Sequence, residues 1–274
     1  MITLENVTCR FGRTKIALDG IDLKITPGHI IGLLGKNGEG KSTLLKIVSG
    51  LIFPNTGICC VQNEKSADRS VSFLNKLYFL PEEVRLPDLK VKDYFKMYAS
   101  FYPTFNKEIL ENCIRLFDIN VLESINKMSM GQKKKVAVTL ALAVNTPVLL
   151  MDEPTNGMDI PSKSTFRKLV ASWMTPERTV IISTHQARDL ETLIDAVIIL
   201  DQHKVAFSCN FEEIGKKLAF CPVGKGEKVL FSDITPAGKI GVIENKYGEE
   251  SEIDLELLFN AVVNNKEEIK RIFS

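Results

Sequence analysis

Residues 35–43 read GKNGEGKST, with the residue types and spacing of a loop that binds phosphate groups. The stretch fits the pattern G-x-x-x-x-G-K-[ST] at Gly35, Gly40, Lys41 and Ser42. Glycines leave room for successive backbone N–H groups to curl around phosphate oxygens. A lysine in this place reaches the β- and γ-phosphates of a nucleotide, and the hydroxyl after it coordinates Mg²⁺. The sequence therefore predicts a nucleotide site that also holds Mg²⁺.

Two adjacent carboxylates end an apolar run further along the chain. Residues 148–153 read VLLMDE, so Asp152 and Glu153 stand where a buried strand would leave the core. Acids in such a place need a cation or a proton to offset their charge. Asp152 therefore fits a Mg²⁺ contact, direct or through water. Glu153 fits a residue that orients or deprotonates an attacking water.

A Ser-Met-Gly-Gln turn and three lysines precede the apolar run VAVTLALAV. The stretch KMSMGQKKK, at 127–135, predicts the N-terminus of a buried helix. Lysines are unfavourable there, because a helix N-terminus is already partly positive. Either an anion binds at this turn or the lysines point into water, and the residues alone leave both open.

The elements that must position these residues alternate between short apolar strands and helices, which is typical of a mostly parallel α/β sheet. We expect apolar strands at 29–35, 148–152, 179–184 and 196–200, and helices at 41–50, 131–145, about 161–174 and near 186–194. Half-exposed antiparallel strands are expected at 2–8 and 21–25, and amphipathic helical structure at 88–122. The expected buried residues of that last segment are Phe95, Tyr98, Phe101, Ile109, Leu110 and Leu116.

The character of the chain changes after about residue 205. The runs EKVLFSDI and KIGVIEN and the amphipathic stretch at 255–273 predict a small α+β appendage.

Composition narrows the class of protein. The chain has 274 residues, 45% of them hydrophobic and 25% charged, as expected of a soluble globular protein. A net charge of +1 argues against a nucleic-acid binder that depends on a broad basic field. The start, MITLENVTCR, does not resemble a signal peptide, and no apolar stretch reaches the length of a membrane span. The six cysteines show no metal-ligand spacing and are expected to stay reduced in a cytosol.

Several motifs together make residues 1–205 resemble the ATP-binding subunit of ABC transporters. GKNGEGKST resembles Walker A, SMGQ at 129–132 the core of the LSGGQ signature, and VLLMDEPTNGMD the Walker B motif plus the D-loop. By this resemblance Glu153 and His185, of STHQ, are catalytic, and Asp159 is the D-loop acid. The implied nucleotide-binding residues are Phe11, Gly35, Lys36, Asn37, Gly38, Glu39, Gly40, Lys41, Ser42, Thr43 and Glu82. Phe11 would stack on adenine, and the implied metal residues are Ser42, Asp152 and Glu82.

The resemblance implies a P-loop NTPase fold of the ABC type. An α/β core would carry an antiparallel β subdomain and a helical subdomain at about 83–135, all within residues 1–205. Residues 206–274 would form a C-terminal accessory domain.

The resemblance also implies partners and a mechanism. Two copies, or a pseudo-dimer, would associate head to tail around ATP and Mg²⁺. The signature residues Ser129, Met130, Gly131 and Gln132 would then face the γ-phosphate held by the other subunit. The subunit would power an integral membrane permease on a separate chain, from the cytoplasmic face of the cell membrane. No nucleic-acid partner is expected.

Two departures from the family pattern bear on turnover. Met130 stands where the signature has its first glycine, which puts a side chain near the dimer seam. Glu82 stands where the family has the glutamine of the Q-loop, and a carboxylate there would bind Mg²⁺ more strongly but repel phosphate. The stretches LPEE and PTNGMD most resemble ATPases of ABC-2-type exporters.

Two alternatives stay open at this point. One is a soluble ABC-type ATPase without a transporter, of the iron–sulfur-assembly type. The other is a weakly hydrolysing, nucleotide-gated scaffold, suggested by Met130 and Glu82.

Overall fold

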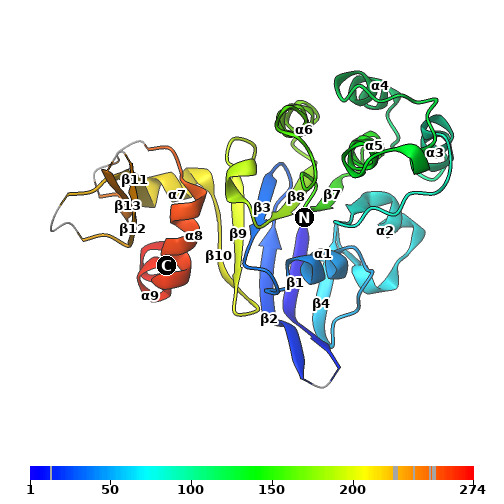
Figure 1. Cartoon of the computed structure of the whole chain (residues 1–274). Helices are drawn as coiled ribbons and strands as arrows, with labels where there is room; N and C mark the ends of the chain where they lie inside the picture. Colours follow the sequence, from blue (N-terminus) through cyan, green and yellow to red (C-terminus); the bar gives the residue numbers. More distant parts are fainter. Residues whose placement is uncertain (13, 225–227, 237, 247, 249–250) are drawn as a thin grey trace.

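The strand before the phosphate loop lies inside a six-stranded sheet (Figure 1). The computed structural model describes residues 1–12, 14–224, 228–236, 238–246, 248 and 251–274. From edge to edge the strands are β10 (Lys204–Asn210), β9 (Ala196–Asp201), β3 (Ile30–Leu34), β8 (Thr179–Thr184), β7 (Val148–Asp152) and β6 (Leu77–Leu80). β10 is antiparallel to β9 and every other pair is parallel. The predicted mostly parallel α/β sheet is therefore confirmed.

A second, antiparallel sheet covers one face of the first. Its strands, in order, are β2 (Lys15–Ile25), β1 (Ile2–Phe11), β4 (Thr56–Val61) and β5 (Glu64–Lys65). This confirms the antiparallel strands predicted at 2–8 and 21–25, which are longer than the sequence pattern indicates.

The helix that follows the phosphate loop, α1 (Lys41–Val48), contributes to the core between the two sheets. Its buried leucines lie in one apolar cluster with side chains of β1, β2, β3 and β7. Gly50, just beyond its end, has a φ of +68°, a conformation that favours glycine and ends the helix. Core residues of the strand before the loop and of the helix after it therefore support the phosphate loop at both of its ends.

Four α-helices and two short 3₁₀ turns make up most of the chain between β5 and β7. They are η1 (Ser66–Asp68), α2 (Val71–Lys76), α3 (Val91–Ala99), α4 (Lys107–Leu116), η2 (Ile125–Lys127) and α5 (Met130–Ala143). The helix predicted at 131–145 is confirmed as α5.

The segment at 88–122 differs from its prediction, because two helices are separated by a loop. α3 ends at Ala99 and α4 starts at Lys107. In the loop between them, Thr104 Oγ1 donates a hydrogen bond to the Val144 carbonyl at 2.6 Å, and Asn106 caps α4, so both residues hold the chain outside a helix. Phe95 and Ile109 are buried as predicted. Phe101 is 66% exposed and Leu116 is also exposed, so the prediction of burial was wrong for these two.

The helix predicted at about 161–174 is confirmed as α6 (Ile160–Ser172). The prediction of a helix near 186–194 is wrong, because that segment forms only a short 3₁₀ turn, η3 (Ala187–Asp189). Asp189 binds Lys163 of α6 at 2.6 Å, and the Asp195 N–H already donates to the Ile30 carbonyl at 3.0 Å. Tertiary contacts at both ends therefore hold this segment outside a regular helix.

The described residues of the C-terminal part form a small sheet and three helices. They are α7 (Phe211–Lys217), β11 (Leu218–Pro222), β12 (Phe231–Thr235), β13 (Gly238–Glu244), α8 (Leu255–Asn264) and α9 (Lys266–Phe273). The sheet order is β11-β13-β12, and all pairs are antiparallel. Leu255 and Leu258 of α8 lie in the same apolar cluster as Leu190 and Ile199, so this part shares a core with the large sheet.

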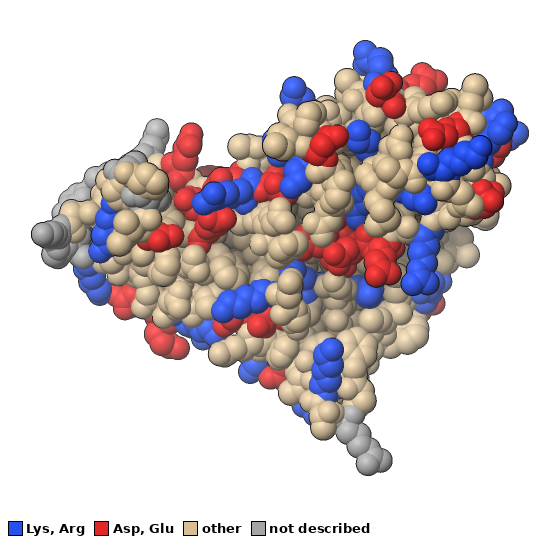
Figure 2. Space-filling model, viewed as in Figure 1, with Lys and Arg blue, Asp and Glu red and all other residues tan. Residues whose placement is uncertain are grey.

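Two further observations concern helix length and surface charge. In the described parts of the chain, no helix is both long and apolar enough to cross a bilayer. Lysine, arginine, aspartate and glutamate side chains are interspersed over the face in Figure 2, without a broad basic field.

Candidate functional site

The phosphate loop closes tightly between β3 and α1. Gly40, which precedes α1, has a φ of +101°, and a Cβ there would lie 2.2 Å from the Ala17 carbonyl oxygen. Lys41 is buried, and its Nζ donates to the Gly35 carbonyl at 2.6 Å and to the Lys36 carbonyl at 3.2 Å. Burial lowers the pKa of Lys41, while the nearby Glu153 and Asp152 carboxylates act in the opposite direction. The loop thus presents a cation next to two acids.

The two acids lie where β7 and β8 end side by side. Asp152 pairs in register with Ser183. The Ser183 Oγ donates a hydrogen bond to Asp152 Oδ1. Glu153 has a φ of +45°, and its N–H donates to the Ser183 carbonyl at 3.1 Å. This turn directs two successive carboxylates to one edge of the sheet. Ser183 was not predicted as a site residue, although its place at the end of a parallel strand beside β7 was a usable signal.

Glu153 and His185 form a hydrogen-bonded pair. Glu153 Oε1 lies 2.8 Å from His185 Nδ1 and accepts the His185 backbone N–H at 2.9 Å. Both bonds fix one carboxylate oxygen, which leaves Oε2 as the candidate acceptor for a proton. Both residues were predicted at the site from the sequence, but their contact was not.

Most of the predicted nucleotide residues line one cavity of about 370 Å³. The lining is Phe11, Lys15, Ile16, Ala17, Asn37, Gly38, Gly40, Lys41, Ser42, Thr43, Glu82, Asp152, Glu153 and His185. Phe11 is 45% exposed, which leaves a face open to a flat ring.

Three residues predicted from the phosphate-loop motif do not line this cavity. Gly35 and Lys36 contribute their carbonyls to Lys41, as described above. The Glu39 carboxylate turns to the β9–β10 hairpin and accepts the His203 N–H at 2.9 Å. A side-chain contact of Glu39 with nucleotide is therefore not supported by its orientation.

Two side chains of the cavity carry oxygen atoms suited to bind Mg²⁺. The Ser42 hydroxyl and the Asp152 carboxylate both face the cavity, and Mg²⁺ prefers such oxygen ligands. Among the described residues no cluster of three or more His, Cys, Asp or Glu could enclose a metal. In nucleotide sites Mg²⁺ generally takes most of its ligands from water and the phosphates.

The signature residues lie apart from this cavity and do not line it. Ser129 caps α5, because its Oγ accepts the Gln132 N–H at 3.2 Å while Gln132 Oε1 accepts the Ser129 N–H at 2.8 Å. Met130 is 83% exposed, and a Cβ on Gly131 would lie 3.0 Å from the Gly157 carbonyl oxygen. Within one chain, the turn at 129–132 therefore borders the segment after Glu153 and faces outward.

Asp159, the predicted D-loop acid, caps α6. Its Oδ1 accepts the Ser162 N–H at 2.7 Å, and hydrogen bonds from Ser162 hold its pKa below the ordinary value. The cap fixes the end of the segment that begins at Glu153.

Glu82 is held by hydrogen bonds to its backbone and to its side chain. Its backbone carbonyl accepts a hydrogen bond from Lys134 Nζ at 2.8 Å, and its Oε1 accepts one from Asn156 Nδ2 at 3.2 Å. Lys134 is only 5% exposed, so the interpretation of all three lysines as solvated surface is wrong for this one. Lys134 and Asn156 were not predicted as site residues.

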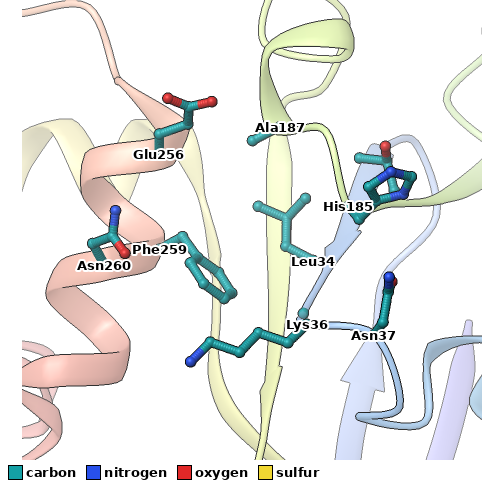
Figure 3. Close-up of a pocket in the computed structure, with 10 residues that line it drawn as sticks. Leu34, Lys36, Asn37, His185, Ala187, Glu256, Phe259 and Asn260 are labelled. Atoms are coloured by element: carbon teal, nitrogen blue, oxygen red, sulfur yellow. The ribbon is translucent and has the colours of Figure 1, made fainter.

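A second cavity, of about 300 Å³, lies beside His185 and is walled by α8 (Figure 3). Phe259 and Asn260 of α8 line it opposite Leu34, Lys36 and the segment at His185. The same helix is tied to the chain that follows the histidine. Arg188 pairs with Glu256 at 2.8 Å, and the Leu255 N–H donates to Glu191 Oε1 at 3.1 Å.

Comparison with known proteins places this arrangement in a family. The family model described as ABC transporter matches residues 18–156. An ABC transporter ATP-binding protein of Methanocaldococcus jannaschii, MJ1023, described as uncharacterized, is 29% identical over 89% of this chain and 91% of its own. The ABC transporter ATP-binding protein NatA of Bacillus subtilis is 27% identical over 78% of this chain and 91% of its own.

A solved structure supports the fold. It is the ATP-binding cassette MJ0796 in a dimeric post-hydrolysis state with ADP and Pi, which superimposes with a TM-score of 0.67. The two chains are 24% identical, over 77% of this chain and 98% of that one. The chain belongs to the ABC transporter family, as an ATP-binding subunit with ATPase activity.

Proposed function

We propose that this subunit binds ATP–Mg²⁺ in the cavity at the phosphate loop and powers a separate membrane-spanning chain through ATP-driven, head-to-tail dimerisation. One observation carries the proposal. Lys41, Asp152 and the bonded pair Glu153–His185 face one cavity, whereas the turn at 129–132 faces outward, away from it. A single chain therefore offers one half of each of two sites.

Each residue of the cavity has a proposed role. Phe11 stacks on adenine, Lys41 leaves its carbonyl partners to bind the β- and γ-phosphates, and Ser42 and Asp152 hold Mg²⁺. When bound, Mg²⁺ neutralises charge on the phosphate oxygens. Glu82 is a further candidate metal contact.

Glu153 is the proposed base for the attacking water. His185 fixes one oxygen of its carboxylate, so the other can accept the proton of a water in line with the γ-phosphate. In the closed dimer the His185 ring contacts the γ-phosphate through Nε2, because Nδ1 faces Glu153. Nε2 would exchange its present contact with Gln186 Nε2, at 3.3 Å, for the phosphate.

The second half of each site comes from another copy. In this proposal Ser129 Oγ and the Gly131 N–H donate to the γ-phosphate held by the opposite subunit, at the positive end of α5. The dimeric state of the similar cassette MJ0796 with ADP and Pi supports this arrangement. Asp159 would lie at the same seam.

A groove of about 590 Å³ supports a membrane partner. It runs between α2, β6 and α3, and its lining includes the exposed apolar side chains Leu51, Val71 and Phe101. Exposed apolar side chains gathered at a groove mark interaction sites. A permease segment that docks here would hold the subunit at the cytoplasmic face of the membrane. Export as the direction is proposed from the resemblance of LPEE and PTNGMD to ABC-2-type exporter subunits.

Nucleotide binding is tested with Lys41→Ala. Loss of a charged donor to the phosphates should weaken ATP affinity by about 10- to 100-fold. Titration of a fluorescent ATP analogue measures this. An unchanged affinity would refute the assignment of the cavity.

Dimerisation is tested by light scattering of Glu153→Gln, with and without ATP–Mg²⁺. Because blocked hydrolysis traps the closed state, the mass should rise from that of one chain to that of two only with nucleotide. Ser129→Arg in the same background should abolish the rise, while the cavity still binds the fluorescent analogue. A rise that survives this change would argue against the head-to-tail arrangement.

A further inference from the structure

The cavity at the phosphate loop contains an excess of acids. Among the described residues, its lining includes three carboxylates, of Glu82, Asp152 and Glu153, and two lysines, Lys15 and Lys41. The proposed ligand, ATP with one Mg²⁺, is itself an anion, so a third carboxylate should weaken its binding. A neutral glutamine would avoid that cost, which raises the question of what allows a glutamate at position 82.

Lys134 brings a further positive charge to the same place. It lies on α5, is 5% exposed, and donates from Nζ to the carbonyl of Glu82 itself at 2.8 Å. A buried ammonium is costly unless negative charge lies near. Its bond to the Glu82 carbonyl places the ammonium beside the residue whose carboxylate lines the acidic cavity together with Asp152 and Glu153. The lysine therefore adds positive charge next to the three acids.

Asn156 completes the connection. It holds the Glu82 carboxylate at 3.2 Å from its Nδ2, and its own N–H donates to the Glu153 carbonyl at 3.3 Å. Glu82 is thus attached to the signature helix through its backbone and to the segment after Glu153 through its side chain. A shift of α5 would move the charge at 82 relative to the nucleotide.

We propose that Lys134 is a positioning residue that ties Glu82 to α5 and supplies the positive charge that lets a carboxylate at 82 face ATP–Mg²⁺. The inference rests on the proposed function, because it assumes that nucleotide occupies this cavity. Under this proposal, the three consecutive lysines after the signature turn have different roles. Lys134 acts on the nucleotide site of its own chain, whereas Lys133 and Lys135 are less buried neighbours on the same helix.

The test compares Lys134→Gln with Lys133→Gln, which removes the same charge from the adjacent position. Without Mg²⁺, Lys134→Gln should weaken binding of a fluorescent ATP analogue by about tenfold, since the site becomes more negative. For the same reason it should lower the Mg²⁺ concentration that gives half-maximal ATPase activity. Lys133→Gln should change both by less than about twofold. Equal effects of the two variants would overturn the proposal.

The double variant Lys134→Gln/Glu82→Gln separates charge from folding. If Lys134 compensates the carboxylate, the second change should restore Mg²⁺-free nucleotide affinity to within about threefold of the unmodified protein. A double variant that stays as weak as Lys134→Gln would show that the charge role is wrong.

Glu82→Gln alone keeps the test informative if Lys134→Gln does not fold. With Lys134 in place, this exposed substitution should strengthen Mg²⁺-free nucleotide binding, and weaker binding would contradict the proposal. Lys41→Ala distinguishes the two levels of inference. Unchanged affinity in that variant would remove the proposed function, whereas affinity lost there but unaffected by Lys134→Gln would remove only this inference.

Discussion

The predicted cassette, residues 1–205, and the C-terminal part, residues 206–274, both lie next to His185, but through different structural features. On one side of His185 lies Glu153, joined to it by hydrogen bonds. On the other side lies α8, which walls the second cavity (Figure 3). The cassette carries every motif recognised in the sequence, and the C-terminal part carries none.

The difference shows that a segment can lie close to a functional site without carrying a recognisable sequence motif. Phosphate and Mg²⁺ chemistry requires particular residue types at fixed spacing, so Lys41 and Asp152 are recognisable. Covering the segment after His185 requires only apolar surface, which Leu255 and Leu258 provide in the shared core. The predicted boundary at 205 also falls inside β10, a strand of the large sheet.

The largest expected effect separates the two sides of His185. Glu153→Gln should lower ATP turnover by about 10²- to 10⁴-fold, because the proposed base is lost, with nucleotide affinity nearly unchanged. Its matched control is Glu256→Gln on α8, which removes one carboxylate near the same loop and should leave turnover within about twofold. Steady-state ATPase assays check both, and equal losses would erase the distinction between the two sides.

A core substitution in α8 tests whether the C-terminal part folds together with the large sheet. Leu258 is fully buried, so Leu258→Ala should reduce the free energy of unfolding by about 2–5 kcal/mol. Because its cluster includes β9 and the η3 segment, the whole protein should unfold earlier, in one transition. Denaturant melts followed by tryptophan fluorescence report this at Trp173, just after α6.

The control for that experiment is Leu122→Ala, at an exposed leucine, which should change stability by about 0.5 kcal/mol or less. Two separate transitions in Leu258→Ala, with the one at Trp173 unshifted, would mean that the C-terminal part folds independently of the cassette.

The smallest expected effect concerns the exposed bridge between the two regions. Arg188 and Glu256 pair at 2.8 Å on the surface, so Arg188→Gln should cost less than about 1 kcal/mol of stability. The difference should shrink further in high salt, because exposed charges are screened. Thermal melts at low and high ionic strength measure it. A larger, salt-independent loss would indicate that this pair, rather than the apolar core, holds α8 in place.

Much of the fold was predictable where local pattern and tertiary role agree. The apolar strands β3, β7, β8 and β9 read as continuous hydrophobic runs because parallel strands are covered on both faces. The helix α5 was predictable from its capping residues, Ser129 and Gln132, and from its apolar body.

The errors arose where distant contacts override local preference. The segment at 186–194 has helical composition, but Asp189 binds Lys163 of α6 and Leu190 is buried in the shared core. Phe101 has an amphipathic helical spacing, yet it lies beyond the end of α3 and beside the exposed groove. Periodicity cannot show which apolar positions the fold leaves uncovered.

By itself, the sequence determined the phosphate loop, the acidic strand end at 152–153 and the family, because this chemistry depends on residues adjacent in the chain. Only the tertiary structure decided that His185 binds Glu153, 32 positions away, and that Lys134 reaches Glu82, 52 positions away. The physical reason is that charge burial depends on what surrounds a side chain. Three consecutive lysines look equivalent until packing removes one of them from water.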